Sequence, residues 1–279
     1  AEEITQRTPQ TMRNVAGYNL ARLNSDRENL AQLLVGSEGT LAFFVRLRLK
    51  LSPFLRSRVL GICHFDGLFE ALDTVQHIVS LNPSAVELVD QNVLSLGASR
   101  LDFRTAMGEF VRGTPKALLL VEFSEELPGA DLGGKLNQLE ELLSELGHPD
   151  SVVRAETESL QSAAWSVRKE GLNIVMSMAG PRKPISFIED CAVPLEHLSD
   201  YARHVEEIFA KHGVEGTWYA HASVGCLHVR PALNLRDPND IHRMRAIAEE
   251  THEVVRRFGG THSGEHGDGL LRSEFIEPM

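Results

Sequence analysis

Segments with the pattern of a β-strand alternate with segments that have the pattern of an α-helix from residue 57 to residue 258. Short apolar or alternating runs predict strands, whereas leucines spaced three and four residues apart predict amphipathic helices. The expected strands cover residues 57–65, 85–90, 116–123, 151–155 and 185–193, with a hairpin at 216–231. The expected helices cover residues 67–80, 91–99, 130–146, 157–178, 195–211 and 238–258.

This order of elements favours an α+β fold in which helices cover one face of a ferredoxin-like antiparallel sheet. A nucleotide-binding Rossmann sheet or P-loop is disfavoured, because neither a GxGxxG turn after a strand nor a GxxxxGK[ST] loop occurs. The beginning of the chain differs, since a polar, turn-rich stretch leads to a glycine-bounded turn at 36–40 and a strand pattern at 41–51. We therefore expect two parts, residues 1–53 and residues 54–279.

Composition limits the classes of partner. A chain of 279 residues with 42% hydrophobic residues can bury one large core or two smaller ones, and its net charge of −11 disfavours nucleic acid and anionic lipid. Three cysteines far apart argue against a disulfide framework and for a reducing compartment. No apolar run is long enough to span a bilayer, so a cytoplasmic location is expected. The polar start without methionine and the abrupt end predict a piece of a longer protein.

Two histidines flank a predicted turn in the hairpin. If Val224 and Gly225 form a two-residue turn, His221 lies directly opposite His228, with Cβ atoms about 4.5–5.5 Å apart. Imidazoles at that distance can share one metal ion. Because side chains alternate along a strand, Cys226, His228 and Arg230 are expected on one face.

The glycine-rich segment 259–269 offers a third ligand. Its glycines allow unusual backbone conformations near a bound group, and Glu265 and His266 supply a carboxylate and an imidazole. Two histidines and one carboxylate form a common divalent metal site. The alternative is that these histidines are structural. Cys226 could form a nucleophilic pair with a histidine, although a small packing residue is the more frequent role of a thiol.

Other polar residues are candidates for binding an acidic substrate. Arg168 and Arg230 could clamp a carboxylate through their guanidinium forks, with Lys183 as a point charge, or could be solvated or paired with glutamates. Glu189 and Asp190 are adjacent on a predicted strand, so at most one of them is expected to face a site. The turn at 36–40 could hold a phosphate or the edge of a flavin through its backbone amides, or could only reverse the chain.

Several of these patterns occur together in an order that resembles the FAD-linked D-2-hydroxy-acid dehydrogenases of the vanillyl-alcohol-oxidase type of flavoproteins. The resemblance covers essentially the whole chain. The patterns are Gly17-Tyr18, Val-Gly-Ser-Glu-Gly-Thr-Leu at 35–41, Trp165 with Arg168, Glu189-Asp190, the two hairpin histidines and Gly-Glu-His-Gly at 264–267. The hairpin has Ala220, Ser223, Val224 and Cys226 where many members have Gly, Gly, Asp and Asn, and so resembles the long members fused to an iron–sulfur domain.

The resemblance implies oxidation of D-lactate or D-2-hydroxyglutarate to the 2-keto acid. It implies that His221, His228 and Glu265 bind a divalent metal, expected to be zinc, and that His266 takes the hydroxyl proton while a hydride passes to FAD. Arg168 and Arg230, with Lys183 as a weaker third, would bind the substrate carboxylate. The residues expected to touch the flavin are Gly17, Tyr18, Gly36, Ser37, Glu38, Gly39 and Thr40.

The resemblance also implies that residues 1–53 are the end of an FAD-binding domain and that 54–279 form the substrate, or cap, domain, truncated at its end. Most FAD contacts would lie in the missing part, so the isolated chain is expected to be inactive. Electrons would pass to an iron–sulfur domain or a carrier, with the protein at the periphery of the inner membrane. Two other functions stay open, a flavin-independent metal hydrolase built on His221, His228 and Glu265, and a non-catalytic docking module.

Overall fold

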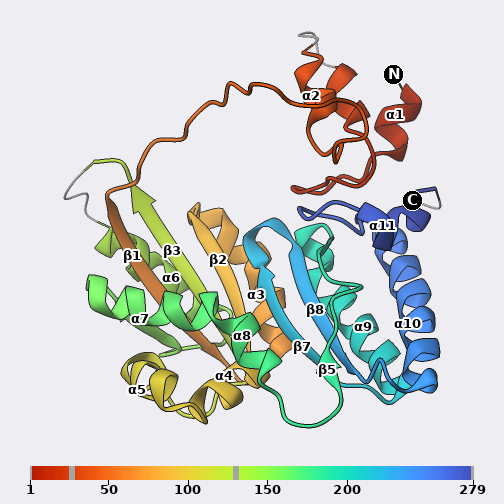
Figure 1. Cartoon of the computed structure of the whole chain (residues 1–279). Helices are drawn as coiled ribbons and strands as arrows, with labels where there is room; N and C mark the ends of the chain where they lie inside the picture. Colours follow the sequence, from red (N-terminus) through yellow and green to blue (C-terminus); the bar gives the residue numbers. More distant parts are fainter. Residues whose placement is uncertain (1, 25–28, 128–131, 278–279) are drawn as a thin grey trace.

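The computed structural model describes residues 2–24, 29–127 and 132–277 (Figure 1). Its antiparallel sheet has the strand order β4-β1-β3-β2-β7-β8-β5, and β6 pairs with β8 beside this path. The strands are β1 (Ser57–Phe65), β2 (Ala85–Asp90), β3 (Ala117–Glu125), β4 (Val152–Ala155), β5 (Lys183–Pro184), β6 (Cys191–Ala192), β7 (Gly216–His221) and β8 (Cys226–Leu233). The order β4-β1-β3-β2 confirms the predicted ferredoxin-like arrangement, which β7 and β8 extend.

The predicted helices are present with bounds close to those expected, and the described residues contain four additional α-helices. They are α1 (Glu2–Arg7), α2 (Ala31–Leu34), α3 (Leu68–Ile78), α4 (Gln91–Ala98), α5 (Leu101–Phe110), α6 (Gly133–Glu145), α7 (Glu158–Lys169), α8 (Gly171–Met176), α9 (Leu198–His212), α10 (Pro238–Arg257) and α11 (Gly269–Arg272). Helices α1, α2, α5 and α11 were not predicted, and α5 lies where a loop was expected. The helix expected at 157–178 divides at Glu170 into α7 and α8. Within the described residues, none of the helices has the length and apolar character needed to traverse a bilayer.

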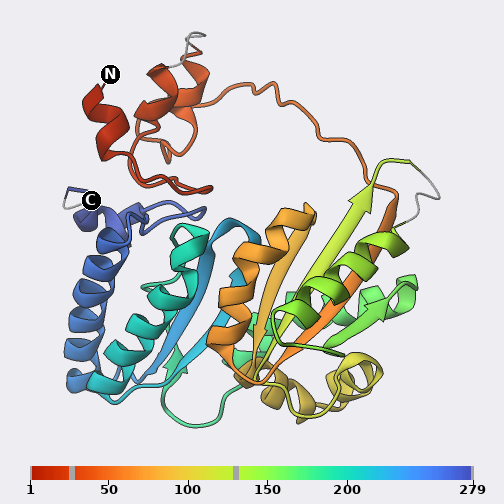
Figure 2. The ribbon, with the colours of Figure 1, turned by 180° about the vertical axis from the view of Figure 1, so that it is seen from behind.

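One face of the sheet is covered by α3, α6 and α9, and α10 packs beside α9 (Figure 2). Leu72 of α3, Leu136 of α6 and Phe209 of α9 are fully buried against this face. Burying each such side chain stabilises the fold by about 1.5–3 kcal/mol. Because this layer holds the larger of the two clusters of buried residues, it forms the main core.

The other face of the sheet is covered only in part. Helices α4, α5, α7 and α8 pack a second core against β1, β2 and β3, with Phe103 of α5 and Ile174 of α8 among its buried residues. In the described chain, β7 and β8 contribute nothing to this second core. The expectation of helices on one face is therefore incomplete, and the surface of β7 and β8 on the second face is left for other contacts (Figure 1).

Residues 41–51 do not form the predicted strand. They run in an irregular extended path between α2 and β1, and pair with no described strand (Figure 1). Phe43 and Val45 are 91% and 90% exposed. The alternation of apolar residues is present, but a strand also needs a partner to accept its backbone hydrogen bonds. Residues before this segment contact the C-terminal loop instead, where Val15 N donates to Ser263 O at 2.9 Å.

Candidate functional site

The two hairpin histidines lie on the sheet face that the helices leave open, but in a different register from the predicted one. His221 pairs with Cys226 and Tyr219 pairs with His228, because residues 222–225 form a longer turn than expected. The shift is two residues, which preserves the side-chain alternation, so both imidazoles stay on one face as diagonal neighbours. Their ring centroids are 5.1 Å apart. The predicted proximity is confirmed and the predicted direct pairing is wrong.

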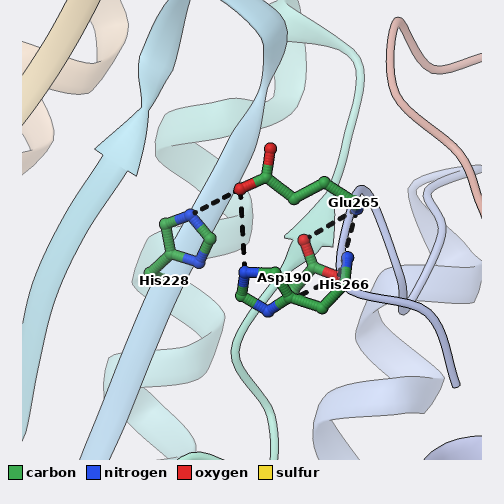
Figure 3. A group of neighbouring side chains, drawn as sticks. All are labelled: Asp190, His228, Glu265 and His266. Carbon is green, nitrogen blue, oxygen red and sulfur yellow. Dashed lines mark hydrogen bonds and ion pairs between the residues drawn. The ribbon is translucent and has the colours of Figure 1, made fainter. Parts of the chain in front are cut away.

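The glycine-rich loop between α10 and α11 brings Glu265 to these histidines. Its Oε1 lies 3.1 Å from His221 Nε2, 3.4 Å from His228 Nε2 and 3.7 Å from His266 Nε2. Figure 3 shows one Glu265 carboxylate oxygen facing ring nitrogens of both His228 and His266. The loop passes close to β6, and a Cβ on Gly260 would lie 2.6 Å from Ala192 O, so only glycine fits there.

Asp190 organises this loop, a role that sequence reasoning missed. It is fully buried and accepts hydrogen bonds from Glu265 N at 2.9 Å, His266 N at 2.9 Å and Ser263 Oγ at 3.1 Å. The expected strand at 185–193 is reduced to β6, since Asp190 has a φ of 76° and cannot continue a strand. As a consequence, both Glu189 and Asp190 face the site, against the prediction that at most one does. The adjacent pair Glu189-Asp190, one of the patterns that carry the family resemblance, was the sequence feature that could have indicated this role.

The cluster has the chemistry of a metal site. Burial, followed by the neighbouring His221 and His266, lowers the pKa of His228 to about 2, which keeps this imidazole neutral and able to donate a lone pair. Asp190, His228, Glu265 and His266 offer ligand atoms within 4.8 Å of one another. Asp190 already accepts the loop's N–H and O–H groups, whereas His221 Nε2 faces Glu265. This four-residue group shares His228 and Glu265 with the predicted set but contains Asp190 and His266 in place of His221, so the set of His221, His228 and Glu265 stays a prediction.

The two candidate arginines lie together beside the histidines. The guanidinium carbons of Arg168 and Arg230 lie 4.9 and 5.9 Å from the centre of the Tyr219 ring. Each is paired with a glutamate, Arg168 with Glu87 at 2.7 Å and Arg230 with Glu189 at 2.6 Å. The Nε atoms of both arginines are buried and have no hydrogen-bond partner among the described residues. The structure thus brings together two cations with donors to spare, as carboxylate binding requires.

Lys183 is not brought to this cluster. It pairs with Leu233 at the end of β8 remote from Cys226, and its Nζ donates to Met178 O at 2.5 Å. Strand β5 pairs with β8 only near Leu233. The Lys183 ammonium group therefore lies away from the histidines and contacts the nearby carbonyl of Met178. Arg168 and Arg230 are the candidates for carboxylate binding that the fold assembles.

Glu87 is a second residue that sequence reasoning missed. It lies on β2 directly opposite His221, although 134 residues separate the two in the chain. Its carboxylate accepts from His221 Nδ1, with distances of 2.8 and 3.0 Å to the two oxygens. A charged residue within the apolar strand 85–90 was the only local signal, because a carboxylate is seldom buried unless it is paired.

Cys226 serves as a packing residue here. Its Sγ lies 3.4 Å from Asp190 Oδ1, and burial, with the Asp190 charge, raises the pKa of the thiol well above its usual value. A thiol held protonated is a poor nucleophile. Cys63, Cys191 and Cys226 are all buried and free of disulfides.

The residues expected to touch a flavin join the N-terminal part to the glycine-rich loop. Gly17 N donates to Asp268 Oδ2 at 2.7 Å, and the Glu38 carboxylate accepts from Asp268 N at 2.7 Å and from Gly269 N at 2.9 Å. Arg13 pairs with Glu265 in the same region. The remaining residues form the turn itself, with a Tyr18 Oη to Thr40 Oγ1 hydrogen bond, a buried Ser37 and positive φ angles at Gly36 and Gly39.

One side of this turn is open. A Cβ added to Gly39 would meet no atom within 4 Å, and Tyr18 and Thr40 are exposed. The turn therefore has room for a bound group beside its backbone amides, as flavin contact requires. Contact between these residues and FAD stays a prediction.

Comparison with known proteins identifies the family of this chain. Residues 55–279 match the family described as "FAD linked oxidases, C-terminal domain". The chain is 30% identical to a D-2-hydroxyglutarate dehydrogenase of Pseudomonas putida, with 99% of this chain and 28% of the relative covered. It is 31% identical to a D-2-hydroxyglutarate dehydrogenase of Pantoea ananatis, with 96% of this chain and 27% of the relative covered. The chain thus spans little more than a quarter of these relatives.

A solved structure shares the fold. The 4-ethylphenol oxidase of Gulosibacter chungangensis superposes with a TM-score of 0.54 at 12% identity, covering 78% of this chain and 47% of that one. At this identity the likeness concerns the fold alone, and it agrees with the family match. The chain belongs to the FAD-linked oxidases and carries their C-terminal domain.

Proposed function

We propose that this chain is the substrate-binding part of an FAD-dependent dehydrogenase that oxidises a D-2-hydroxy acid to the 2-keto acid. The observation that carries the proposal is the cluster of His221, His228 and Glu265 beside Arg168 and Arg230 on one open sheet face. A hydroxy acid presents a hydroxyl group and a carboxylate side by side. The cluster offers ligands that suit a metal near the first and guanidinium groups for the second.

His266 is the proposed base. Its ring stacks on that of His228 with centroids 5.2 Å apart, it is half-exposed, and it is held by the hydrogen bond from its backbone N to Asp190. It therefore lies beside the metal ligands and still reaches a substrate, whose hydroxyl proton it would accept. The bound groups that the family implies would supply a Lewis acid, predicted to be zinc, and FAD as hydride acceptor. The remaining residues bind and orient the acid.

D-2-Hydroxyglutarate is the first candidate substrate and D-lactate the second. The relatives named above support this order. Comparison of kcat/KM for D-2-hydroxyglutarate and D-lactate with the same FAD-loaded protein would rank the two substrates.

We further propose that residues 1–53 are the end of an FAD-binding domain and residues 54–279 the substrate domain. The exposed, alternating segment 41–51 supports this, since its apolar residues would be covered by a sheet in another part of the protein. An iron–sulfur domain or electron carrier as acceptor is a prediction that a reduction assay with the longer protein would test. We also predict a cytoplasmic location at the periphery of the inner membrane, which cell fractionation would test.

The central test is His266→Ala in the full-length, FAD-loaded protein, with a substitution of the exposed His77, His77→Ala, as control. Loss of a general base lowers kcat by about 10²–10⁴-fold, and the control should be unaffected. Equal rates of D-2-hydroxy-acid oxidation in the His266 variant and the wild type would refute the mechanism. Ester or amide hydrolysis by the zinc-loaded protein without FAD would favour the metal hydrolase instead.

A further inference from the structure

We propose that Glu87 is a positioning residue that joins the metal-binding and carboxylate-binding halves of this site. It orients one candidate ligand, His221, and one candidate substrate contact, Arg168, through a single carboxylate. This inference rests on the proposed function, because it assumes that His221 binds a metal and that Arg168 binds the substrate.

The first contact determines how His221 presents its ring. Glu87 Oε1 and Oε2 lie 2.8 and 3.0 Å from His221 Nδ1. A carboxylate only accepts, so Nδ1 carries the hydrogen and the lone pair is on Nε2. Nε2 is the atom that lies 3.1 Å from Glu265 Oε1. Glu87 thereby selects the tautomer and ring orientation that a metal ligand needs.

The second contact holds the arginine. Glu87 Oε2 lies 2.7 Å from Arg168 Nη2, and both side chains are mostly buried. Arg168 comes from α7, on the helical layer over the second face, whereas His221 ends β7 in the sheet. Glu87 thus links α7 to β7, because it contacts a side chain from each, and it holds the Arg168 guanidinium group near the Tyr219 ring.

Burial shows that this carboxylate is held by its partners. Glu87 is only 8% exposed, and β2 lies between β3 and β7 in the sheet. A carboxylate in such a place is unfavourable unless it is paired and hydrogen-bonded. Glu122 of β3 is a natural comparison because it lies opposite Ala85, two residues from Glu87, and so points from the same sheet face as a diagonal neighbour. It accepts from Trp165 Nε1 at 3.1 Å and is absent from the histidine cluster.

The experiment compares Glu87→Ala and Glu87→Gln with Glu122→Gln in the full-length, FAD-loaded protein. Zinc affinity is measured by competition with a chelator, and kcat and KM for D-2-hydroxyglutarate are measured on the same samples. Loss of a group that orients a metal-bound histidine weakens metal binding by about 10–100-fold. Glu87→Ala should show this loss together with a raised KM. Glu87→Gln keeps an acceptor for His221 Nδ1 but not the charge, so its zinc affinity should recover more than its KM.

The outcomes separate this inference from the proposed function. If the wild type binds zinc and both Glu87 variants match its affinity and its KM, Glu87 has no positioning role. If the wild type binds no zinc, the proposed metal site fails and the inference fails with it. If Glu87→Ala does not fold, the isosteric glutamine variant decides. An equal loss of affinity in Glu122→Gln would show a general effect of the sheet and would also overturn the inference.

Discussion

Replacing Asp190 by asparagine should detach the glycine-rich loop 259–269 from the rest of the fold. The carboxylate is fully buried, its oxygens accept from Glu265 N, His266 N and Ser263 Oγ, and Arg272 Nη1 lies 3.7 Å away. Asparagine has the same shape, but its NH₂ group must face at least one of these donors. Because the buried charge is lost and a donor is left unpaired, the free energy of unfolding should fall by about 3–5 kcal/mol.

The assay is urea unfolding of Asp190→Asn beside Asp150→Asn, with zinc affinity as a second measurement. Asp150 is a matched control, since it also has a positive φ of 55° but is exposed. Asparagine tolerates the left-handed region well, so neither variant strains the backbone and the comparison isolates the carboxylate network. A stability of Asp190→Asn equal to that of the control, with unchanged zinc binding, would refute the assignment of Asp190 as the organiser of the loop.

Three further predictions concern other parts of the fold. A Cβ on Gly225, whose φ is 70°, would lie 2.1 Å from Val193 O, so Gly225→Ala should lower stability in urea unfolding by at least about 1–3 kcal/mol; no loss would contradict the packing of this turn. Burial lowers the pKa of His252 to about 4 from 6.5, so the unfolded chain takes up the proton first. Stability should be full above pH 6.5 and fall by about 3 kcal/mol as the pH drops toward 4, and His252→Phe should flatten this slope in urea unfolding at several pH values. Cys226→Ala should keep the wild-type kcat, since a protonated thiol has no part in the chemistry, and a large loss would restore the nucleophile hypothesis.

Local patterns were sufficient where neighbours in the chain decide the outcome. Strands β1 and β2 have the predicted bounds, and α3 and α9 lie within a few residues of theirs, because periods of 2 and 3.6 report which side a segment buries. Helix α5 escaped prediction, since its start at Arg100 has no side-chain cap.

Patterns failed where a partner from elsewhere was needed. Residues 41–51 alternate as a strand does, yet pair with no described strand, and the expected strand at 185–193 yields to Asp190 and its positive φ. The hairpin register differed because the turn length, which decides the register, is not visible in the composition of the turn.

The candidate site divides in the same way. The sequence by itself determined that Cys226, His228 and Arg230 share a face and that Glu265 and His266 lie in a flexible-backbone, glycine-rich loop, since both follow from neighbouring residues. Only the tertiary structure decided that Glu87 meets His221 across 134 residues and that Asp190 meets Glu265 across 75. The physical reason is that strand pairing and loop docking join segments far apart in the chain, and the burial of a shared surface, which no local pattern reports, selects which of them meet.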